Sequence, residues 1–228
     1  MKKLLNLFVV ALVIGVLFIG CKKDADDDDI DVPTTTHYDK PASANVSSNL
    51  TSLNENFSSG AWTLKMGFTT DTNSAQMMEM GMAGNTTEEF TVDNSGIITY
   101  TKVTIYTKQT MPGSGTMIAA LGGVDSSVQT DPTSGLKMKQ SISGEDLIIE
   151  MWGRIPQDEI DTQNATNPTL TDLFEGIDNT ATIYTNSDNS LYYISYSGTK
   201  ESETENEFTG VTTTVAIDVT YTAILKKK

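Results

Sequence analysis

The chain has 228 residues and carries 30 acidic against 15 basic side chains, a formal net charge of −15. This length predicts one domain, or two small ones. Nucleic acids and anionic lipid surfaces are poor partners for such a chain, because phosphate contacts require clustered Lys and Arg. A single Cys excludes an intramolecular disulfide, and a single His, His37, excludes paired-imidazole zinc sites and most Ser-His triads.

Residues 1–20 have the organisation of a secretory signal peptide, with two early lysines, an apolar run over 4–19 and the small residue Gly20 before Cys21. The sequence Ile19-Gly20-Cys21 resembles the lipobox of bacterial lipoproteins. The resemblance implies cleavage before Cys21, a thioether-linked diacylglycerol on its sulfur, and acylation of its new amine by a fatty acid such as palmitate. Two or more acyl chains anchor a protein lastingly to a membrane. The alternative is an uncleaved anchor helix with an inert Cys21.

Residues 21–47 are predicted to form a flexible stem, and its beginning is strongly acidic. The acidic residues are Asp24, Asp26, Asp27, Asp28, Asp29 and Asp31. Such a run is typical of a solvated, self-repelling tether. After a lipidated Cys it also resembles the signal that sends lipoproteins to the cell surface in one group of Gram-negative bacteria. We therefore expect an outer-membrane lipoprotein exposed at the cell surface, with a periplasm-facing location as the alternative.

Residues 48–228 are predicted to form one β-domain. Leu50, Leu53 and Phe57 recur at spacings of three and four, which predicts a short helix. Alternation with a period of two predicts a first strand over 62–68. Strand-forming residues bounded by turns predict further strands over 90–92, 97–107, 117–121, 136–142, 147–152, 182–185, 191–196 and 211–225. Residues 154–179 are expected to form a long loop with one helical turn at 170–174.

Short turns between the predicted strands favour antiparallel pairing, because parallel pairing needs long crossovers. In the last strand, side chains of one parity between Val211 and Leu225 are mostly apolar, which should fix its register. Closing the meander removes exposed strand edges. The predicted fold class is therefore all-β, an antiparallel barrel of eight or nine strands after a signal peptide and stem, with a sandwich as second choice.

The sequence Gly60-Ala61-Trp62 opens the first predicted strand. A Gly-x-Trp at this place, followed by a meander of strands, resembles lipocalin-like proteins. In that family the Trp closes one end of the barrel, and the opposite mouth takes an apolar ligand. The final stretch, residues 220–226, also looks like the closing strand of lipocalin-like bacterial lipoproteins. The resemblance implies a lipocalin-like barrel that binds a small hydrophobic ligand.

Methionines crowd one short segment, at Met77, Met78, Met80 and Met82. Their soft thioethers suit Cu(I), and alternation would place the last three on one side of an extended chain. The alternatives are that they fill an apolar face or line the lip of a hydrophobic cavity. The residues predicted to contact a ligand are Trp62, Met78, Met80, Met82 and Trp152.

Carboxylates accompany Trp152 in the sequence, at Glu145, Asp146, Glu150, Asp158, Glu159 and Asp161. Paired carboxylates beside an aromatic platform are what a glycosidase or a sugar site needs. Tyr184, Tyr192, Tyr193 and Tyr196 could stack on sugars. Solvated loop charges and ordinary strand aromatics are the alternative interpretation. The sequence has no phosphate-binding loop, nucleophile elbow or zinc signature, so we expect no enzyme activity, no cofactor and no metal.

Two functions of different classes agree with these patterns. The first is a lipid-anchored module that binds a small hydrophobic ligand in its barrel. The second is a cell-surface adhesion or accessory protein whose barrel is filled by its own side chains. An envelope hydrolase is the weakest candidate. The expected partners are the membrane, through the lipid on Cys21, and the hydrophobic ligand, but not nucleic acid.

Overall fold

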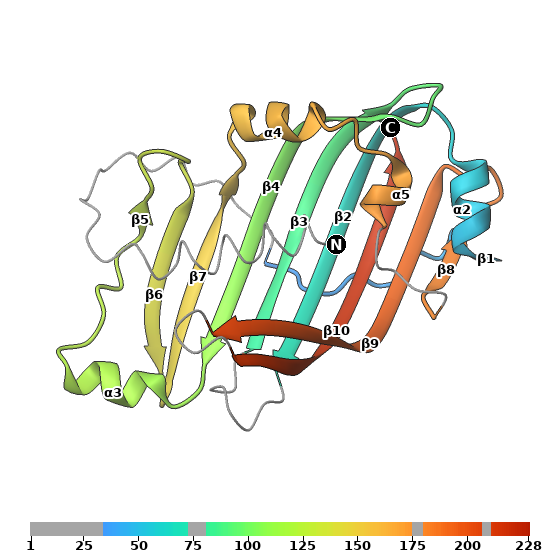
Figure 1. Cartoon of the computed structure of the whole chain (residues 1–228). Coiled ribbons are helices and arrows are strands. Elements are labelled where there is room, and N and C mark those ends of the chain that lie inside the picture. Colours follow the sequence, from blue (N-terminus) through green and yellow to red (C-terminus); the bar gives the residue numbers. More distant parts are fainter. Residues whose placement is uncertain (1–33, 73–80, 175–179, 207–210) are drawn as a thin grey trace.

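The computed structural model describes residues 34–72, 81–174, 180–206 and 211–228. Within these ranges, ten antiparallel strands form one sheet in the order β1-β8-β9-β10-β2-β3-β4-β7-β6-β5. Short helices accompany the sheet (Figure 1). The prediction of an all-β domain with antiparallel strands is therefore confirmed.

The strands are β1 (Val46–Ser48), β2 (Gly60–Thr72), β3 (Gly81–Val92), β4 (Ile98–Met111), β5 (Gln129–Thr130), β6 (Lys137–Ser143), β7 (Asp146–Arg154), β8 (Thr182–Thr185), β9 (Leu191–Asn206) and β10 (Val211–Lys227). The helices are α2 (Leu50–Asn56), α3 (Ser114–Ala120), α4 (Gln157–Asn164) and α5 (Leu170–Leu173). The predicted short helix at residue 50 and the predicted hairpins are confirmed. β9 extends well beyond its expected end at residue 196, whereas β10 ends close to the expected position.

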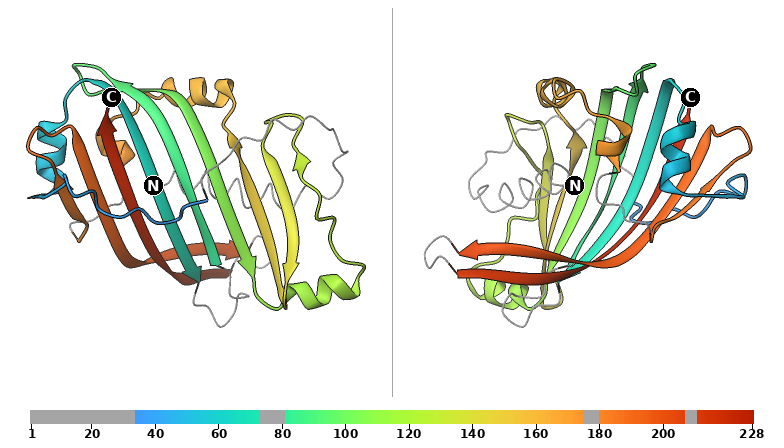
Figure 2. Two further views of the ribbon diagram at one scale, coloured as in Figure 1. Left: turned by 180° about the vertical axis from the view of Figure 1, so that it is seen from behind. Right: turned by 45° about the vertical axis from the view of Figure 1, so that its right-hand side comes forward.

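The predicted closure into a barrel is wrong for the part of the chain that the structure describes. β1 and β5 stand at the two ends of the strand order, with three and two residues respectively. Strands this short expose few unpaired backbone groups, which weakens the reason for closure. Figure 2 shows a strongly curled sheet, with a ribbon of β9 and β10 projecting beyond it. There is also no second sheet among the described residues, so the sandwich alternative is wrong as well.

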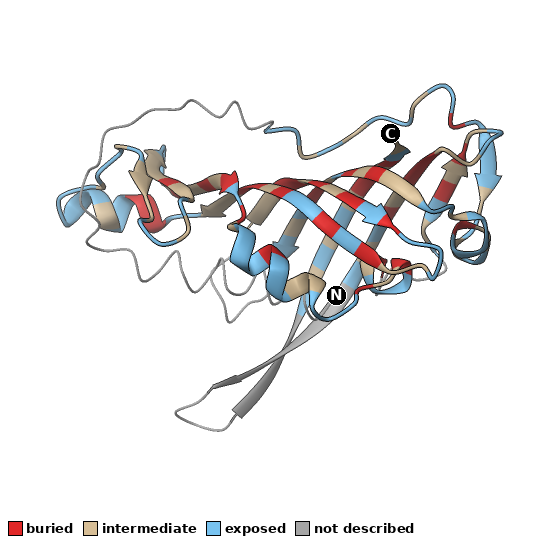
Figure 3. Cartoon of the chain, turned by 90° about the horizontal axis from the view of Figure 1, so that it is seen from above, coloured by how far each residue is buried: buried red, intermediate tan, exposed pale blue. Residues whose placement is uncertain are grey.

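We call the face of the sheet that carries Trp62 the front face, and the opposite one the back face. The core lies on the front, where Leu53 of α2, Ile160 of α4 and Leu170 of α5 pack onto strand residues. Buried and exposed positions alternate along the strands (Figure 3). The helices therefore bury the apolar front face, which removes the need for the sheet to close on itself.

Helices α4 and α5 are attached to the free edge of β4. β7 pairs with β4 only from Thr104 to Met111, so the preceding residues of β4 need other partners. Asn164 supplies two, accepting from the Tyr100 N–H at 2.8 Å and donating to its carbonyl at 3.0 Å. Helix α5 confirms the helical turn predicted at 170–174. Helix α4 was not predicted, because these residues were expected to form a loop. Ile160 is the one buried residue of α4, and a single apolar position gives no helical periodicity.

An N-terminal segment, residues 34–44, crosses the back face, and we call it the strap. A Cβ atom at Gly67 of β2 would lie 2.6 Å from the carbonyl carbon of Thr36. The Tyr38 N–H donates to Thr222 Oγ1 of β10 at 2.8 Å. Ala44 is fully buried against side chains of β9. The strap therefore passes over β2, β10 and β9 in turn, so this part of the predicted stem lies against the sheet (Figure 2).

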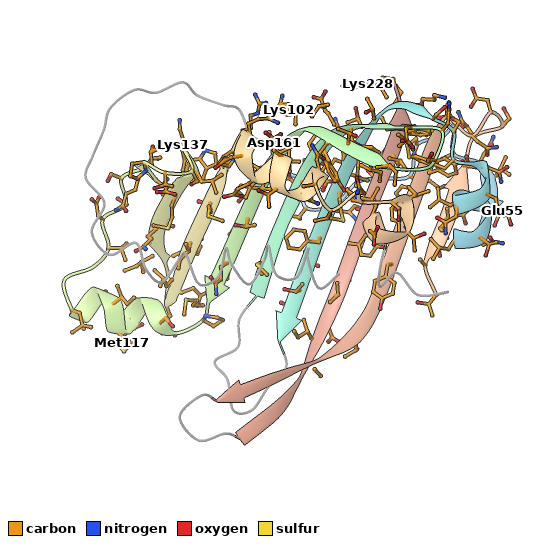
Figure 4. All side chains as sticks on the ribbon, turned by 45° about the horizontal axis from the view of Figure 1, so that its top comes forward. Glu55, Lys102, Met117, Lys137, Asp161 and Lys228 are labelled. Carbon is orange, nitrogen blue, oxygen red and sulfur yellow. The ribbon has the colours of Figure 1, made fainter. Side chains whose placement is uncertain are left out.

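The strand predicted over 117–121 is wrong, because these residues belong to α3 and its end. Ala119 and Ala120 favour a helix, and the run is too short for alternation to outweigh them. Met117 and Leu121 are 60% and 81% exposed, and Met117 points away from the sheet (Figure 4). Gly115 is needed here, since a Cβ would lie 2.8 Å from the backbone of the β6–β7 turn.

Candidate functional surfaces on the two faces of the sheet

Trp62 has the surroundings of a core residue. It is fully buried and stacks on Phe57, with ring centroids 4.2 Å apart. Its Nε1 donates to the Ser58 carbonyl at 3.0 Å, and the Tyr192 ring lies 6.3 Å away. A flat face and the polar edge of the indole are therefore engaged by neighbouring groups of the protein.

One carboxyl group lies within this apolar front face. Glu88 on β3 is 5% exposed and sits between Leu64 of β2 and Val103 of β4. The Thr86 hydroxyl donates to its Oε1 at 3.3 Å. Burial raises the pKa of Glu88 to about 7, while the hydrogen bond from Thr86 acts in the opposite direction. Glu88 is consequently neutral in acid and becomes charged within the core near neutral pH.

Tyr100 of β4, whose backbone is hydrogen-bonded to Asn164 of α4, lies close enough to Glu88 to feel its charge. Tyr100 is 5% exposed, and its ring lies 5.7 Å from that of Phe90. Burial raises the pKa of Tyr100, and the charges of Glu88 and Asp172 raise it further. The Tyr100 hydroxyl therefore keeps its proton throughout the working range of a protein.

The back face of the same strands is basic. Directly paired residues of neighbouring strands share a face. The odd-numbered residues of β3 point to the back, so the residues of β2 and β4 that pair with them point to the back as well. The back-facing cations of β2, β4, β6 and β7 are Lys65, Lys102, Lys108, Lys137, Lys139 and Arg154. We call this set the basic face. It gathers six of the 15 basic residues of a chain whose net charge is −15.

Trp152 and Glu150 lie at the centre of the basic face. Trp152, which is half-buried, pairs with Tyr106 on β4 and with Lys137 on β6. Glu150 lies one step along the same face, between two lysines of the basic face. The Tyr106 hydroxyl donates to Glu150 Oε1 at 2.8 Å. Burial, followed by this bond, raises the pKa of Tyr106, so the hydroxyl stays a donor and fixes the carboxylate.

The pKa of Glu89, which points to the back of the sheet, is lowered by the cations around it. Glu89 is 3.9 Å from the Lys102 ammonium and accepts a hydrogen bond from Lys228. That bond, with the charges of Lys228, Lys102 and Arg154, holds the pKa of Glu89 below its usual range. Each such pair contributes little to stability because it is solvated. The shift nevertheless shows that several cations act on one position.

The acids that accompany Trp152 in the sequence do not gather around it. Asp158, Glu159 and Asp161 are exposed on α4, which covers the front face. Glu145 and Asp146 belong to the turn between β6 and β7. Glu150 is the one acid of this set beside Trp152, because Asp146, which has the same parity, stands six residues away at the start of β7. The arrangement supports the interpretation of these acids as solvated loop charges.

The remaining predicted site residues are dispersed. Trp62 and Trp152 lie on opposite faces of the sheet, so they do not line one site. Met82, half-buried, begins β3 on the front face. Cys21 lies outside the described residues, as do the other members of the methionine cluster, Met77, Met78 and Met80. His37 is exposed in the strap, 3.5 Å from Asp39.

The four predicted sugar-stacking tyrosines are also divided between the faces. Tyr192 and Tyr196 belong to the front, where they pair with Leu225 and Tyr221 of β10. Tyr184 and Tyr193 belong to the back, where the strap packs on them through Ala44. A single aromatic platform made from these four rings is therefore not formed.

Comparisons of the chain with family models, curated proteins and solved structures gave no match. Across the described ranges, no helix combines the length and the apolar character needed to cross a membrane. The same residues contain no group of three or more His, Cys, Asp or Glu placed to hold a metal ion. The function has to be inferred from the two faces.

Sequence reasoning missed Glu88 and the basic face. Glu88 stands in a polar run, and only its register with Leu64 places it in the core. The cations are spread from Lys65 to Arg154, and the sheet brings them together. One local signal was available, since Lys137 and Lys139 alternate with a buried methionine on a predicted strand.

Proposed function

We propose that this protein is a lipid-anchored interaction protein of the bacterial envelope, exposed at the cell surface, whose β-domain binds a partner through the back of its sheet. The anchoring part rests on the signal peptide and on the lipobox resemblance at Cys21. The interaction part is the second of the two functions expected from the sequence.

The observation that carries the proposal is the filling of the front face. Trp62, Ile194 and Leu225 are fully buried there, and helices α2, α4 and α5 add their own apolar side chains. These side chains occupy the volume in which a barrel of this kind would hold a ligand. The front face accordingly has the role of a hydrophobic core, and the surface left for a partner is the back.

The basic face supplies a reason for a partner to bind there. Six cations brought together on neighbouring strands repel one another, and a partner with negative charge relieves that repulsion. The half-buried ring of Trp152 adds an apolar contact at the centre, which is the usual place of a binding hot spot. The partner that fits this surface carries negative charge where it touches the sheet.

A titration of the mature protein with dextran sulfate, with neutral dextran as control, tests this function. We expect saturable binding of the sulfated polymer alone, weakening as salt screens the charges. Lys137→Gln with Lys139→Gln should weaken binding roughly fivefold per charge removed, for about 1 kcal/mol each. Lys227→Gln is the matched control, because Lys227 pairs with Trp62 and therefore has the front parity. Equal binding by all three proteins would contradict the proposal.

The membrane anchor has its own test. Mass spectrometry of the N-terminal peptide should find a diacylglycerol-modified Cys21 with no residue before it. An unmodified Cys21 still joined to Gly20 would rule out the anchor. Protease treatment of intact cells then distinguishes surface display from a periplasm-facing location, because a protein facing the periplasm survives.

A second function, binding of a small hydrophobic ligand, is favoured by the half of the front face far from Trp62. Val219, Met82 and Ile149 are half-buried in one cross-strand row there. Displacement of a fluorescent fatty acid separates the two functions. A filled front face gives no saturable signal, whereas a carrier gives a stoichiometric one.

A further inference from the structure

We propose that the acidic run of the stem, residues 24–31, docks on the basic face of its own chain. The run lies outside the described residues, so the inference rests on the surface, on the path of the strap and on charge. It uses the same face as the proposed function. Docking can be measured without any partner, so the two ideas fail independently.

The strap leads toward the basic face. Followed backward from Ala44, it crosses β9, then β10 at Tyr38, then β2 at Thr36. The next strands in the sheet are β3, β4, β7 and β6, and β4, β7 and β6 carry five of the six cations. Continuing the same line beyond Thr36 therefore carries the chain over the basic face.

The spacing of strands and residues matches this path. Neighbouring strands lie about 4.8 Å apart, and an extended chain advances about 3.4 Å per residue. Crossing from β2 to β7 takes three strand spacings, which needs at least about four extended residues, and reaching β6 needs at least about six. Asp31 lies five residues before Thr36 and Asp28 lies eight, so Asp31 has the length to reach β7 and Asp28 has the length to reach β6. Those strands carry Arg154 and two lysines of the basic face.

The charges of the two partners are opposite in sign. The stem run holds six aspartates, and the basic face holds six cations, with Glu89 and Glu150 among them on the same side of the sheet. Each group repels itself when it stands alone, and docking relieves both. Solvated pairs are individually weak. Because the stem is already attached, however, its effective concentration is in the millimolar range, and weak contacts suffice to hold it.

Docking would change how far the domain stands from its anchor. The free stem from Cys21 to Thr34 spans at most about 45 Å, whereas only about 10 Å separates Cys21 from a run docked at Asp24. The docked stem would hold the domain close to the membrane. An external polyanion that takes the basic face would release the stem, so binding and reach would be coupled.

Carbodiimide cross-linking of the mature lipidated protein in detergent micelles tests docking, because the reagent joins carboxylates to lysines that touch them. We expect peptide 24–31 to be linked to Lys108, Lys137 or Lys139. These links should fall at least tenfold in about 1 M salt, where the Debye length is about 3 Å. Lys227, which pairs with Trp62 and so has the front parity, is the internal control. Equal yields of links to Lys227 and to the basic face would overturn the proposal.

A competition experiment provides a second readout. Replacing Asp26, Asp27, Asp28 and Asp29 by Asn should remove the links and tighten dextran sulfate binding roughly fivefold, since about 1 kcal/mol of self-docking is lost. Circular dichroism confirms that the variant is folded. Unchanged affinity in the variant would count against docking. Cross-links without dextran sulfate binding would retain docking and remove the proposed partner.

Discussion

The front and the back of this sheet are built from alternating residues of the same strands, yet they differ in nearly every physical property. The front buries aromatic and aliphatic side chains beneath helices α2, α4 and α5. The back of β4, β7 and β6 carries lysines and an arginine around Trp152. Because side chains alternate with a period of two, one strand can stabilise the fold with one face and meet a partner with the other.

Two adjacent glutamates show the contrast within a single peptide. Glu88 points to the front, where burial raises its pKa to about 7. Glu89 points to the back, where the Lys228 hydrogen bond and neighbouring cations lower its pKa. One residue step therefore moves a carboxyl from an environment that rejects its charge to one that attracts it.

The largest effect on stability should come from a comparison of the two tryptophans. Trp62→Ala removes a fully buried indole from the front face and should cost about 3–5 kcal/mol of unfolding free energy. Trp152→Ala, on the back, should cost less than about 1.5 kcal/mol because its ring is only half-buried. Urea unfolding at one pH measures both. Equal losses would contradict the division of roles between the faces.

A smaller, pH-dependent effect should follow from Glu88→Gln. The folded pKa of Glu88 is above its unfolded value near 4.5, so wild-type stability falls as pH rises from about 4.5 to about 7 and stays low above it. The amide cannot ionise, and the variant should be more stable at pH 8 by up to about 3 kcal/mol.

Denaturant unfolding at pH 4.5 and at pH 8 checks this prediction. At the lower pH, Glu88→Gln and wild type should agree to within about 0.5 kcal/mol, since both carry a neutral side chain. Glu89→Gln is the matched control, and it should slightly destabilise the protein at pH 8, where the charged form is favoured. A Glu88→Gln variant that gained nothing at pH 8 would show that Glu88 does not ionise in a buried site.

An intermediate effect is expected at the strap. Gly67→Ala would place a Cβ 2.6 Å from the Thr36 backbone, so the strap must move, at a cost of about 1–3 kcal/mol. Limited proteolysis should then cut within residues 34–44 faster than in wild type. Thr69→Ala, an exposed position on the same strand, should behave as wild type. Unchanged proteolysis of Gly67→Ala would mean that the strap does not rest on β2.

The smallest change in stability should come from the basic face. Lys137→Gln with Lys139→Gln should alter the unfolding free energy by no more than about 0.5 kcal/mol, because solvated charges contribute little to folding. The same substitutions should weaken polyanion binding clearly. Urea unfolding beside the dextran sulfate titration separates the two effects. A large loss of stability would assign these lysines to the fold.

Local features of the fold could be predicted, whereas its closure could not. Turn residues at 93–96 and 143–146 and the alternation of β10 identified hairpins and register, since these depend on neighbouring residues. β3 was expected to start at Phe90, but it starts at Gly81, because the polar run around Glu88 hides the strand. The open edges depend on the lengths of β1 and β5 and on helices covering the front. No local pattern encodes these.

The candidate surface escaped prediction for the same reason. A net charge of −15 argued against anionic partners, yet charge is distributed by strand pairing, which sets Lys108 and Lys139 on either side of Glu150. Trp152 was predicted to join Trp62, but parity places the two rings on opposite faces. Composition describes the whole chain, whereas a partner meets one face of it.

Fluorescence quenching of Trp62 tests the central claim most directly. The chain has two tryptophans, so Trp152→Phe leaves Trp62 as the one indole and reports from the centre of the front face. A brominated fatty acid quenches an indole that it touches. A front face filled by the protein's own side chains predicts no saturable quenching of Trp62. Saturable, stoichiometric quenching would show a ligand inside the front face and would contradict its role as a core.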